Sequence, residues 1–214
     1  VAALAALPLR AQQSTVNAHD DYTEYHLLDP ASHAFHIVYY LNQRQVGATT
    51  VLNQTRSGSE GSDVSVSDPQ TGQPLKFEYK TGAELTTAGE AGRLNAAEHY
   101  IRAFLLRPVP EGGEGRVRIE KTYTDEKSYY AQNEEIVFAR SLGIGRNAIV
   151  LPKGFVIGSS NVAAQVTALA DGRVKLVFEN VNTYASDVSI RGRKSVAPVA
   201  PALEVAERAF DFAK

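Results

Sequence analysis

The sequence predicts an all-β domain, an antiparallel β-sandwich of about 10 to 13 short strands. Most of the chain alternates between apolar and polar residues with a period of two, as a half-buried strand does. Gly, Pro, Asn and Asp interrupt this alternation at short intervals. Of the 214 residues, 43% are hydrophobic and 21% are charged, which is enough apolar material for one substantial core.

The first pair of strands is predicted on either side of a turn. Tyr22 to Leu28 is the first strand, and Asp29-Pro30-Ala31-Ser32 follows with strong turn chemistry, because Asp accepts local hydrogen bonds and Pro presets φ. Ala34 to Leu41 then alternates as the second strand. The residues that this alternation places on one face are Phe35, Ile37, Tyr39 and Leu41.

The middle of the chain gives further strands and one ambiguous segment. The strands expected here are Thr49 to Thr55, Val64 to Ser67 and Leu75 to Tyr79, and the last two flank the turn "DPQTGQP". Apolar residues between Gly92 and Arg107 fit both a helix and a strand. We expect a short helical or irregular piece near Ala91 to Glu98, then a strand from His99 to Arg107.

Later strands are expected in "RVRIEKTY", "EEIVFAR", "NAIVLP" and "SDVSIRGR". The stretch "TALADGRVKLVFEN" predicts a hairpin, because Asp171-Gly172 is the strongest short turn signal in the chain. We expect the sandwich to occupy residues 20–194.

The two ends differ in character from the sandwich. Residues 1–19 begin with the small, apolar stretch "VAALAALPL", which resembles a signal-peptide remnant with Ala11 at a plausible cleavage position, or else forms an N-terminal arm that needs a surface to cover it. This favours a secreted, periplasmic or cell-surface protein. Residues 195–214 combine a Pro/Ala linker, "SVAPVAPA", with a short amphipathic helix, "LEVAERAFDFAK".

Composition excludes several classes of function. The formal net charge is −2, from 22 Lys and Arg against 24 Asp and Glu, and this balance argues against nucleic-acid binding. The absence of cysteine excludes disulfides, thiolate metal sites and thiol nucleophiles. No run approaches the roughly 18 apolar residues of a transmembrane helix.

Histidines in "DPASHAFHIVYY" raise the question of a metal site. His33 and His36 are an odd number of residues apart, so a strand sends them to opposite faces. A hairpin could instead set His26 across from His36, with His19 or Asp21 as a third ligand. We favour histidines on a polar strand face, and therefore expect no metal and no cofactor.

Catalytic motifs are not found in the sequence. It contains no H-E-x-x-H and no G-x-S-x-G, and "GIGRNA" has only two glycines of a dinucleotide fingerprint. We therefore name no catalytic residue and expect no enzymatic activity from this chain. Ten tyrosines leave open a role in stacking on sugars or in a protein interface, although tyrosines in strands more often fill a core edge.

The stretch "EYHLLDPASHAFHIVYYL" resembles the opening strands of the N-terminal β-domain of aminopeptidase N-type metallopeptidases. Leu28, Asp29, Pro30, His33 and Phe35 carry the resemblance, and the later strands follow it to Arg193 only as a succession. The family's zinc motif lies in a separate domain, so the resemblance implies a secreted β-sandwich that accompanies an enzyme, and no catalytic residue carries over.

Two classes of function follow from these observations. The first is a non-catalytic structural or interaction module of the cell envelope or exterior, which in its sharper form assembles into a polymer through its N-terminal arm or a sheet edge. The alternative is an accessory domain of a larger secreted peptidase or glycan-processing enzyme. A carbohydrate-binding domain with tyrosine platforms is a weaker third reading.

Overall fold

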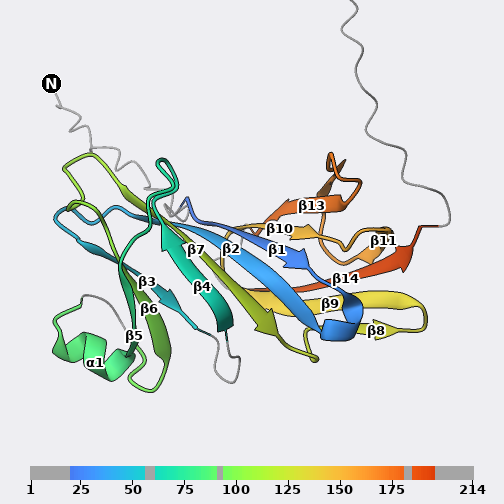
Figure 1. The fold of residues 1–214 in the computed structure, drawn as a ribbon, viewed down its shortest axis with the longest axis horizontal. Coiled ribbons are helices and arrows are strands. Elements are labelled where there is room, and N and C mark those ends of the chain that lie inside the picture. Colours follow the sequence, from blue (N-terminus) through green and yellow to red (C-terminus); the bar gives the residue numbers. More distant parts are fainter. Residues whose placement is uncertain (1–19, 56–60, 91–93, 181–184, 196–214) are drawn as a thin grey trace, which may run out of the picture.

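Fourteen strands arranged in three sheets account for most of the protein in a computed structural model, which describes residues 20–55, 61–90, 94–180 and 185–195 (Figure 1). The described residues hold one short α-helix, α1 (Gly82–Thr87), and one 3-10 turn, Pro30–Ser32. The predicted all-β class is confirmed. None of the described helices is long and apolar enough to span a membrane.

The largest sheet has seven strands in the order β12-β13-β10-β1-β2-β7-β4. Its central strands β1 and β2 form the predicted antiparallel pair, and β1 also pairs in parallel with β10. The strands of this sheet are β1 (Tyr22–Leu27), β2 (Ala34–Gln43), β4 (Gly61–Ser67), β7 (Gly115–Thr124), β10 (Arg146–Val150), β12 (Gln165–Ala168) and β13 (Val174–Glu179).

Two smaller antiparallel sheets complete the sandwich. One has the order β11-β14-β9-β8, and the other has the order β3-β6-β5. Their strands are β3 (Thr50–Gln54), β5 (Phe77–Thr81), β6 (His99–Phe104), β8 (Tyr129–Gln132), β9 (Glu135–Leu142), β11 (Phe155–Ser160) and β14 (Ser186–Lys194). Figure 1 shows β5 and β6 at the lower left of the molecule and β8 and β9 at the lower right.

The core lies between the large sheet and the two smaller ones. Phe138 of β9 packs against the large sheet, with its ring centroid 5.5 Å from those of both Tyr25 and Phe35. Ile101 of β6 belongs to the same buried cluster and is fully buried. The residues predicted to share one face of the second strand, Phe35, Ile37, Tyr39 and Leu41, are all buried in this core.

Local turn chemistry forms two of the predicted turns. Asp29 Oδ1 accepts a hydrogen bond from Ala31 N at 2.8 Å, and Pro30 begins the 3-10 turn that joins β1 to β2. Asp171 and Gly172 connect β12 to β13, and the φ of +83° at Gly172 is one that glycine adopts at little cost. Both predictions are confirmed.

The piece expected near Ala91 to Glu98 is irregular rather than helical in its described part, and the strand expected after it begins at His99. Residues 94–98 form a turn, because Asn95 Oδ1 accepts from Ala97 N and because Gly82 N and Ala83 N donate to the carbonyls of Glu98 and Ala96. The helix forms earlier, at α1, which the sequence reasoning missed. Thr81 and Glu84 make a capping box at its start.

Two other differences concern strands, and the predictions for the chain ends are not tested by the described residues. Strands β8 and β11 were not predicted, and the strand expected from Leu75 begins at Phe77. The predicted N-terminal arm, residues 1–19, lies outside the described residues. The linker and helix predicted for 195–214 also lie outside them, apart from Ser195.

Candidate functional site

The histidine pair of the metal hypothesis is brought together on the outer face of the large sheet. His26 and His36 are direct cross-strand partners, with ring centroids 6.3 Å apart. His36 Nε2 lies 3.1 Å from Glu120 Oε2, and its Nδ1 lies 3.2 Å from Thr122 Oγ1. His33 instead occupies the turn before β2, where its Nδ1 lies 3.0 Å from the Tyr129 carbonyl oxygen.

The described residues do not supply the third ligand of that hypothesis. Asp21 is an odd number of residues from His26, and its Oδ1 accepts a hydrogen bond from Asn42 N at 2.8 Å. His19 lies outside the described residues. Within residues 20–55, 61–90, 94–180 and 185–195, no three His, Cys, Asp or Glu side chains are grouped in a way that could hold a metal ion.

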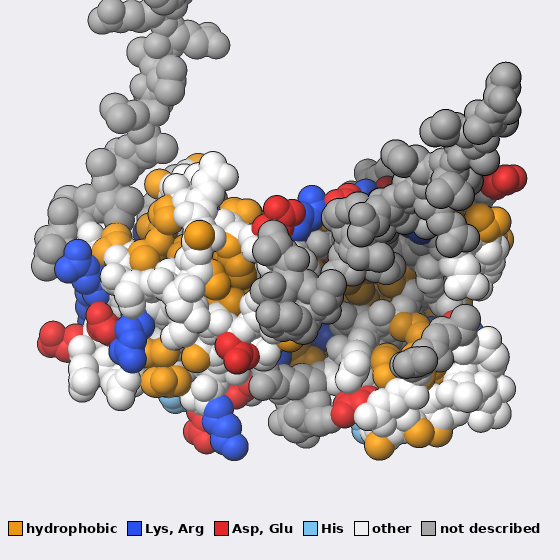
Figure 2. All heavy atoms as spheres, turned by 180° about the vertical axis from the view of Figure 1, so that it is seen from behind, with side chains coloured by type: hydrophobic (Ala, Val, Ile, Leu, Met, Phe, Trp, Pro, Cys, Tyr) orange, Lys and Arg blue, Asp and Glu red, His pale blue; other side chains and the backbone are white. Residues whose placement is uncertain are grey.

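Burial and nearby cations affect the charge of His26. Burial lowers the pKa of His26, the positive charges of Arg173 and Lys175 lower it further, and the carboxylate of Glu24 only partly opposes them. On the same face, the rings of Tyr22 and Tyr40 stack with centroids 5.9 Å apart. Acidic and basic side chains are interspersed on the face of the molecule shown in Figure 2.

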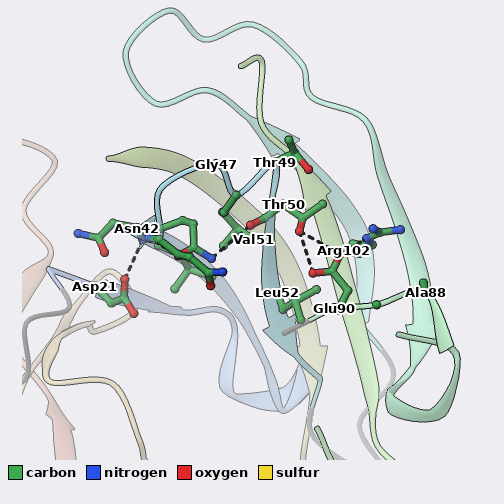
Figure 3. Close-up of a pocket in the computed structure, with 15 residues that line it drawn as sticks. Asp21, Asn42, Gly47, Thr49, Thr50, Val51, Leu52, Ala88, Glu90 and Arg102 are labelled. Atoms are coloured by element: carbon green, nitrogen blue, oxygen red, sulfur yellow. Dashed lines mark hydrogen bonds and ion pairs between the residues drawn. The ribbon is translucent and has the colours of Figure 1, made fainter. Parts of the chain in front are cut away.

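A more promising site is a groove beside strand β3, which we call the β3 groove. It has a volume of about 520 Å³ and lies between β3, the end of β2 and the segment after α1. Figure 3 shows Asp21 and Asn42 on one side of the Thr50-to-Leu52 stretch, with Glu90 and Arg102 on the other. The groove thus follows the side of β3.

Strand β3 is an edge strand, because its sheet has the order β3-β6-β5. Leu105 N donates to the Thr49 carbonyl at 2.9 Å, and Thr55 N donates to the His99 carbonyl at 2.8 Å. In antiparallel pairing, residues facing the neighbour alternate with residues facing away. The register therefore turns the backbone N–H and C=O of Thr50, Leu52 and Gln54 away from β6.

Only part of this edge is occupied by other groups of the described chain. Gln43 Nε2 donates to the Thr50 carbonyl at 3.4 Å. The backbone N–H and C=O of Leu52 have no hydrogen-bond partner within the described residues. The N–H and C=O of Leu52 are therefore free to pair with the backbone of a further strand added alongside β3.

One wall of the groove is built by a satisfied ion cluster. Thr50 Oγ1 donates to Glu90 at 3.0 Å, Arg102 Nε donates to Glu90 Oε1 at 2.6 Å, and Arg102 donates to Glu78 Oε1 at 3.0 Å. Burial by itself lowers the pKa of Arg102, but its hydrogen bonds and the charges of Glu78 and Glu90 outweigh burial and raise that pKa. The cluster therefore holds the segment after α1 against β3.

The opposite wall contains an unpaired acceptor. Asn42 Nδ2 donates to Glu114 Oε2 at 3.2 Å, and a carboxylate accepts only, so this contact fixes the orientation of the amide. Asn42 Oδ1 is then a buried acceptor with no hydrogen-bond partner among the described residues. Asn42 itself is 7% exposed. A buried acceptor of this kind costs free energy until a donor reaches it.

The other sheet edges are protected in ways that β3 is not. The pairing of β4 shifts register between Ser62 and Ser65, and β11 carries a similar irregularity. Strands β8 and β12 have only four residues each, and β5 carries Glu78 and Lys80. Bulges, short length and charge all discourage strand addition. Strand β3, with the sequence TVLNQ, has no charge and no proline, and its pairing with β6 shows no register shift.

Sequence reasoning did not find the β3 groove. The strand itself was predicted as Thr49 to Thr55, but its position at a sheet edge depends on pairing with β6, about fifty residues further along the chain. The one available signal was the uncharged run TVLNQ.

Comparison with solved structures gives matches to metallopeptidases of the M1 family, the same family as the resemblance seen in the sequence. One is the M1 zinc metallopeptidase from Deinococcus radiodurans, with 12% identity, a TM-score of 0.48, and coverage of 80% of this chain and 41% of that chain. Another is an aminopeptidase N family protein from Idiomarina loihiensis, with 8% identity, a TM-score of 0.46, and coverage of 80% of this chain and 29% of that one. The chain thus spans less than half the length of these proteins.

Comparisons at the level of sequence return nothing. No protein-family model matches the chain, and no curated protein matches it.

Proposed function

We propose that this chain is a non-catalytic interaction module, secreted or held in the cell envelope, that binds an extended segment of a protein partner as an added strand on β3. The observation that carries the proposal is the unpaired backbone of Leu52 in the β3 groove. An extended peptide running along β3 would donate one hydrogen bond to Leu52 and accept one from it. Strand addition of this kind takes its affinity from main-chain hydrogen bonds and its specificity from alternate side chains.

The chemistry of the groove indicates a polar partner segment. Its walls carry Asp21, Asn42, Glu90 and Arg102, and the last two are already paired with one another. The buried Asn42 Oδ1 would accept a hydrogen bond from a donor on the incoming segment if binding moves the wall and exposes this atom. Each net hydrogen bond contributes only about 0.5 to 1.5 kcal/mol, so several contacts along the groove are needed for micromolar binding.

The functions considered from the sequence differ in which molecule supplies the added strand. A segment of another protein makes the chain an interaction module, and a segment of a second copy makes it a self-assembling one. A segment of a further domain in a longer protein makes it the accessory domain of a peptidase or glycan-processing enzyme. All three use the same edge of β3, so the edge itself is tested first.

The test uses a phage library of random dodecapeptides selected on the immobilised chain. Leu52→Pro is the test variant, because proline removes the N–H that faces the groove. Val166→Pro is the matched control. Leu169 N donates to the Arg173 carbonyl at 2.8 Å, so the register of β12 also turns the Val166 N–H away from its neighbour, at an edge outside the groove.

We expect selected peptides to bind the natural chain and Val166→Pro with equal affinity, and to bind Leu52→Pro at least tenfold more weakly. Circular dichroism melting checks that both variants fold. Peptides that bind all three proteins equally, or a selection that enriches no peptide, would contradict the proposal. Size-exclusion chromatography of the natural chain and of Leu52→Pro identifies self-pairing, which Leu52→Pro would abolish.

A further inference from the structure

A second cavity lies where the three sheets meet, and it shares no lining residue with the β3 groove. It has a volume of about 520 Å³, and we call it the junction cavity. Strands β1, β2 and β7 of the large sheet contribute the rings of Tyr25, Tyr39 and Tyr123. Asn53 of β3 and Arg140 of β9 face the cavity from the two smaller sheets.

The amine of Lys121 lies directly behind this wall. Lys121 is 1% exposed, and its Nζ donates to Asn53 Oδ1 at 2.7 Å. The same Nζ lies 4.8 Å from the ring centroid of Tyr39 and 5.2 Å from that of Tyr123. All three contact residues line the junction cavity, so one layer of side chains separates the amine from the cavity.

The charges around the cavity do not balance within the described residues. Arg140 is also buried, and its guanidinium donates to Asp125 Oδ2 at 3.1 Å. Lys121 has no carboxylate within ion-pair distance in the described part of the chain. Among the described residues, Arg140 thus has a carboxylate partner and Lys121 has none. Burying a second cation without a counter-charge is costly, and here it is compensated only by an amide oxygen and two ring faces.

This environment disfavours the charged form of the Lys121 amine. Burial, together with the positive charge of Arg140, lowers the pKa of Lys121 to about 7. The Tyr39 hydroxyl does not supply the missing charge, because burial raises its pKa well above the ordinary value and keeps it neutral.

We propose that the junction cavity binds a small organic carboxylate, whose charge pairs with Lys121 and Arg140 and whose body packs against Tyr25, Tyr39 and Tyr123. The inference does not depend on the β3 groove, because it rests on different residues and a different cavity. An aromatic carboxylate fits this wall best, since ring faces and edges pack against tyrosine. Binding requires the Asn53 side chain to give Nζ access to the anion.

The experiment follows the side-chain NMR signals of 13C-labelled lysine during addition of benzoate, acetate or chloride at constant ionic strength. The Lys121 signal is identified by its loss in Lys121→Met. We expect benzoate to shift this signal saturably and to raise the pKa of Lys121 from about 7 to about 8 or higher, since a carboxylate within a few ångströms favours the charged amine. Acetate should do the same at higher concentration, and chloride should not.

Two results would overturn the proposal. One is a Lys121 signal that benzoate leaves unchanged. The other is a shift that grows linearly with every anion, which indicates ionic strength alone. As a second readout, saturating benzoate should raise the melting temperature of the natural chain and of the surface control Lys175→Met. If Lys121→Met shows the same rise, the assignment of the anion to this amine is wrong.

Discussion

Lys121 Nζ donates a hydrogen bond to Asn53 Oδ1 at 2.7 Å, and this buried contact joins the seven-stranded sheet to the three-stranded sheet. Lys121 lies on β7 opposite Ile37, in the row of side chains that faces the core. The long, apolar stem of a lysine can fill this space, but its amine then needs a partner. Asn53 supplies that partner from β3, the same strand whose free edge forms the β3 groove.

Stability should rise with pH because of Lys121. Its folded-state pKa of about 7 is below the unfolded value of 10.5, so the unfolded chain binds the extra proton between these pH values. The free energy of unfolding should therefore increase by about 2 kcal/mol between about pH 7.5 and about pH 9.5, measured by urea denaturation.

Lys121→Met should remove this increase, whereas Lys175→Met should retain it. Lys175 is a suitable control because hydrogen bonds and the charge of Glu24 outweigh burial and raise its pKa above the ordinary value, so it titrates above this range. An equal pH dependence in both variants would show that Lys121 is not the group responsible.

Neighbouring residues of β3 should differ sharply in their tolerance of proline. The N–H of Val51 faces β6, and that of Leu52 faces the groove. Val51→Pro should therefore lower the free energy of unfolding by about 2 kcal/mol more than Leu52→Pro, because it also leaves a carbonyl of Ala103 unpaired. Urea denaturation of both variants measures the difference. Equal losses would mean that the register of β3 is not the one described.

Phe138 should be one of the most costly core residues to truncate. Its ring is 1% exposed and packs at 5.5 Å against both Tyr25 and Phe35, so it joins β9 to the large sheet. Phe138→Ala should cost about 3 to 5 kcal/mol in urea denaturation. A loss below about 1 kcal/mol would contradict the packing of these two sheets.

Gly82 should not tolerate a side chain. A Cβ at this position would lie 2.0 Å from the Asn95 carbonyl oxygen, a backbone atom that cannot move without opening the turn after α1. We expect Gly82→Ala to lower the melting temperature by several degrees, at about 1 kcal/mol or more. Gly143→Ala, where a Cβ meets nothing within 4 Å, is the matched control and should be nearly neutral.

Much of the fold follows from local chemistry that the sequence displays. The alternation after Asp29 places Phe35, Ile37 and Tyr39 in the core, and Asp171-Gly172 forms the expected turn. The helix α1 is the exception, because helical structure was considered only between Ala91 and Glu98, where residues 94–98 instead form a turn that Gly82 and Ala83 hold by hydrogen bonds. The capping box at Thr81 was the signal that would have placed α1 correctly.

The two candidate sites depend on contacts between distant parts of the chain. The β3 groove requires that β3 lie at an edge, and the junction cavity requires that Lys121, Asn53 and Arg140 meet from three sheets. Local alternation assigns Lys121 to a strand face but does not show that the face is buried under another sheet.

The position of the histidine pair, by contrast, could be predicted from local sequence. Adjacent strands brought His26 and His36 together as the hairpin suggested, with no third ligand among the described residues.

The central claim, that β3 accepts an added strand, is tested most directly by amide hydrogen exchange at Leu52. In the free chain the Leu52 amide should exchange rapidly, while that of Val51, bonded to β6, should be protected. Saturation with a selected dodecapeptide should slow exchange at Leu52 at least tenfold and leave the Val166 amide on the other edge unchanged. A Leu52 amide that is already protected in the free chain, or that the bound peptide leaves unprotected, would contradict the account.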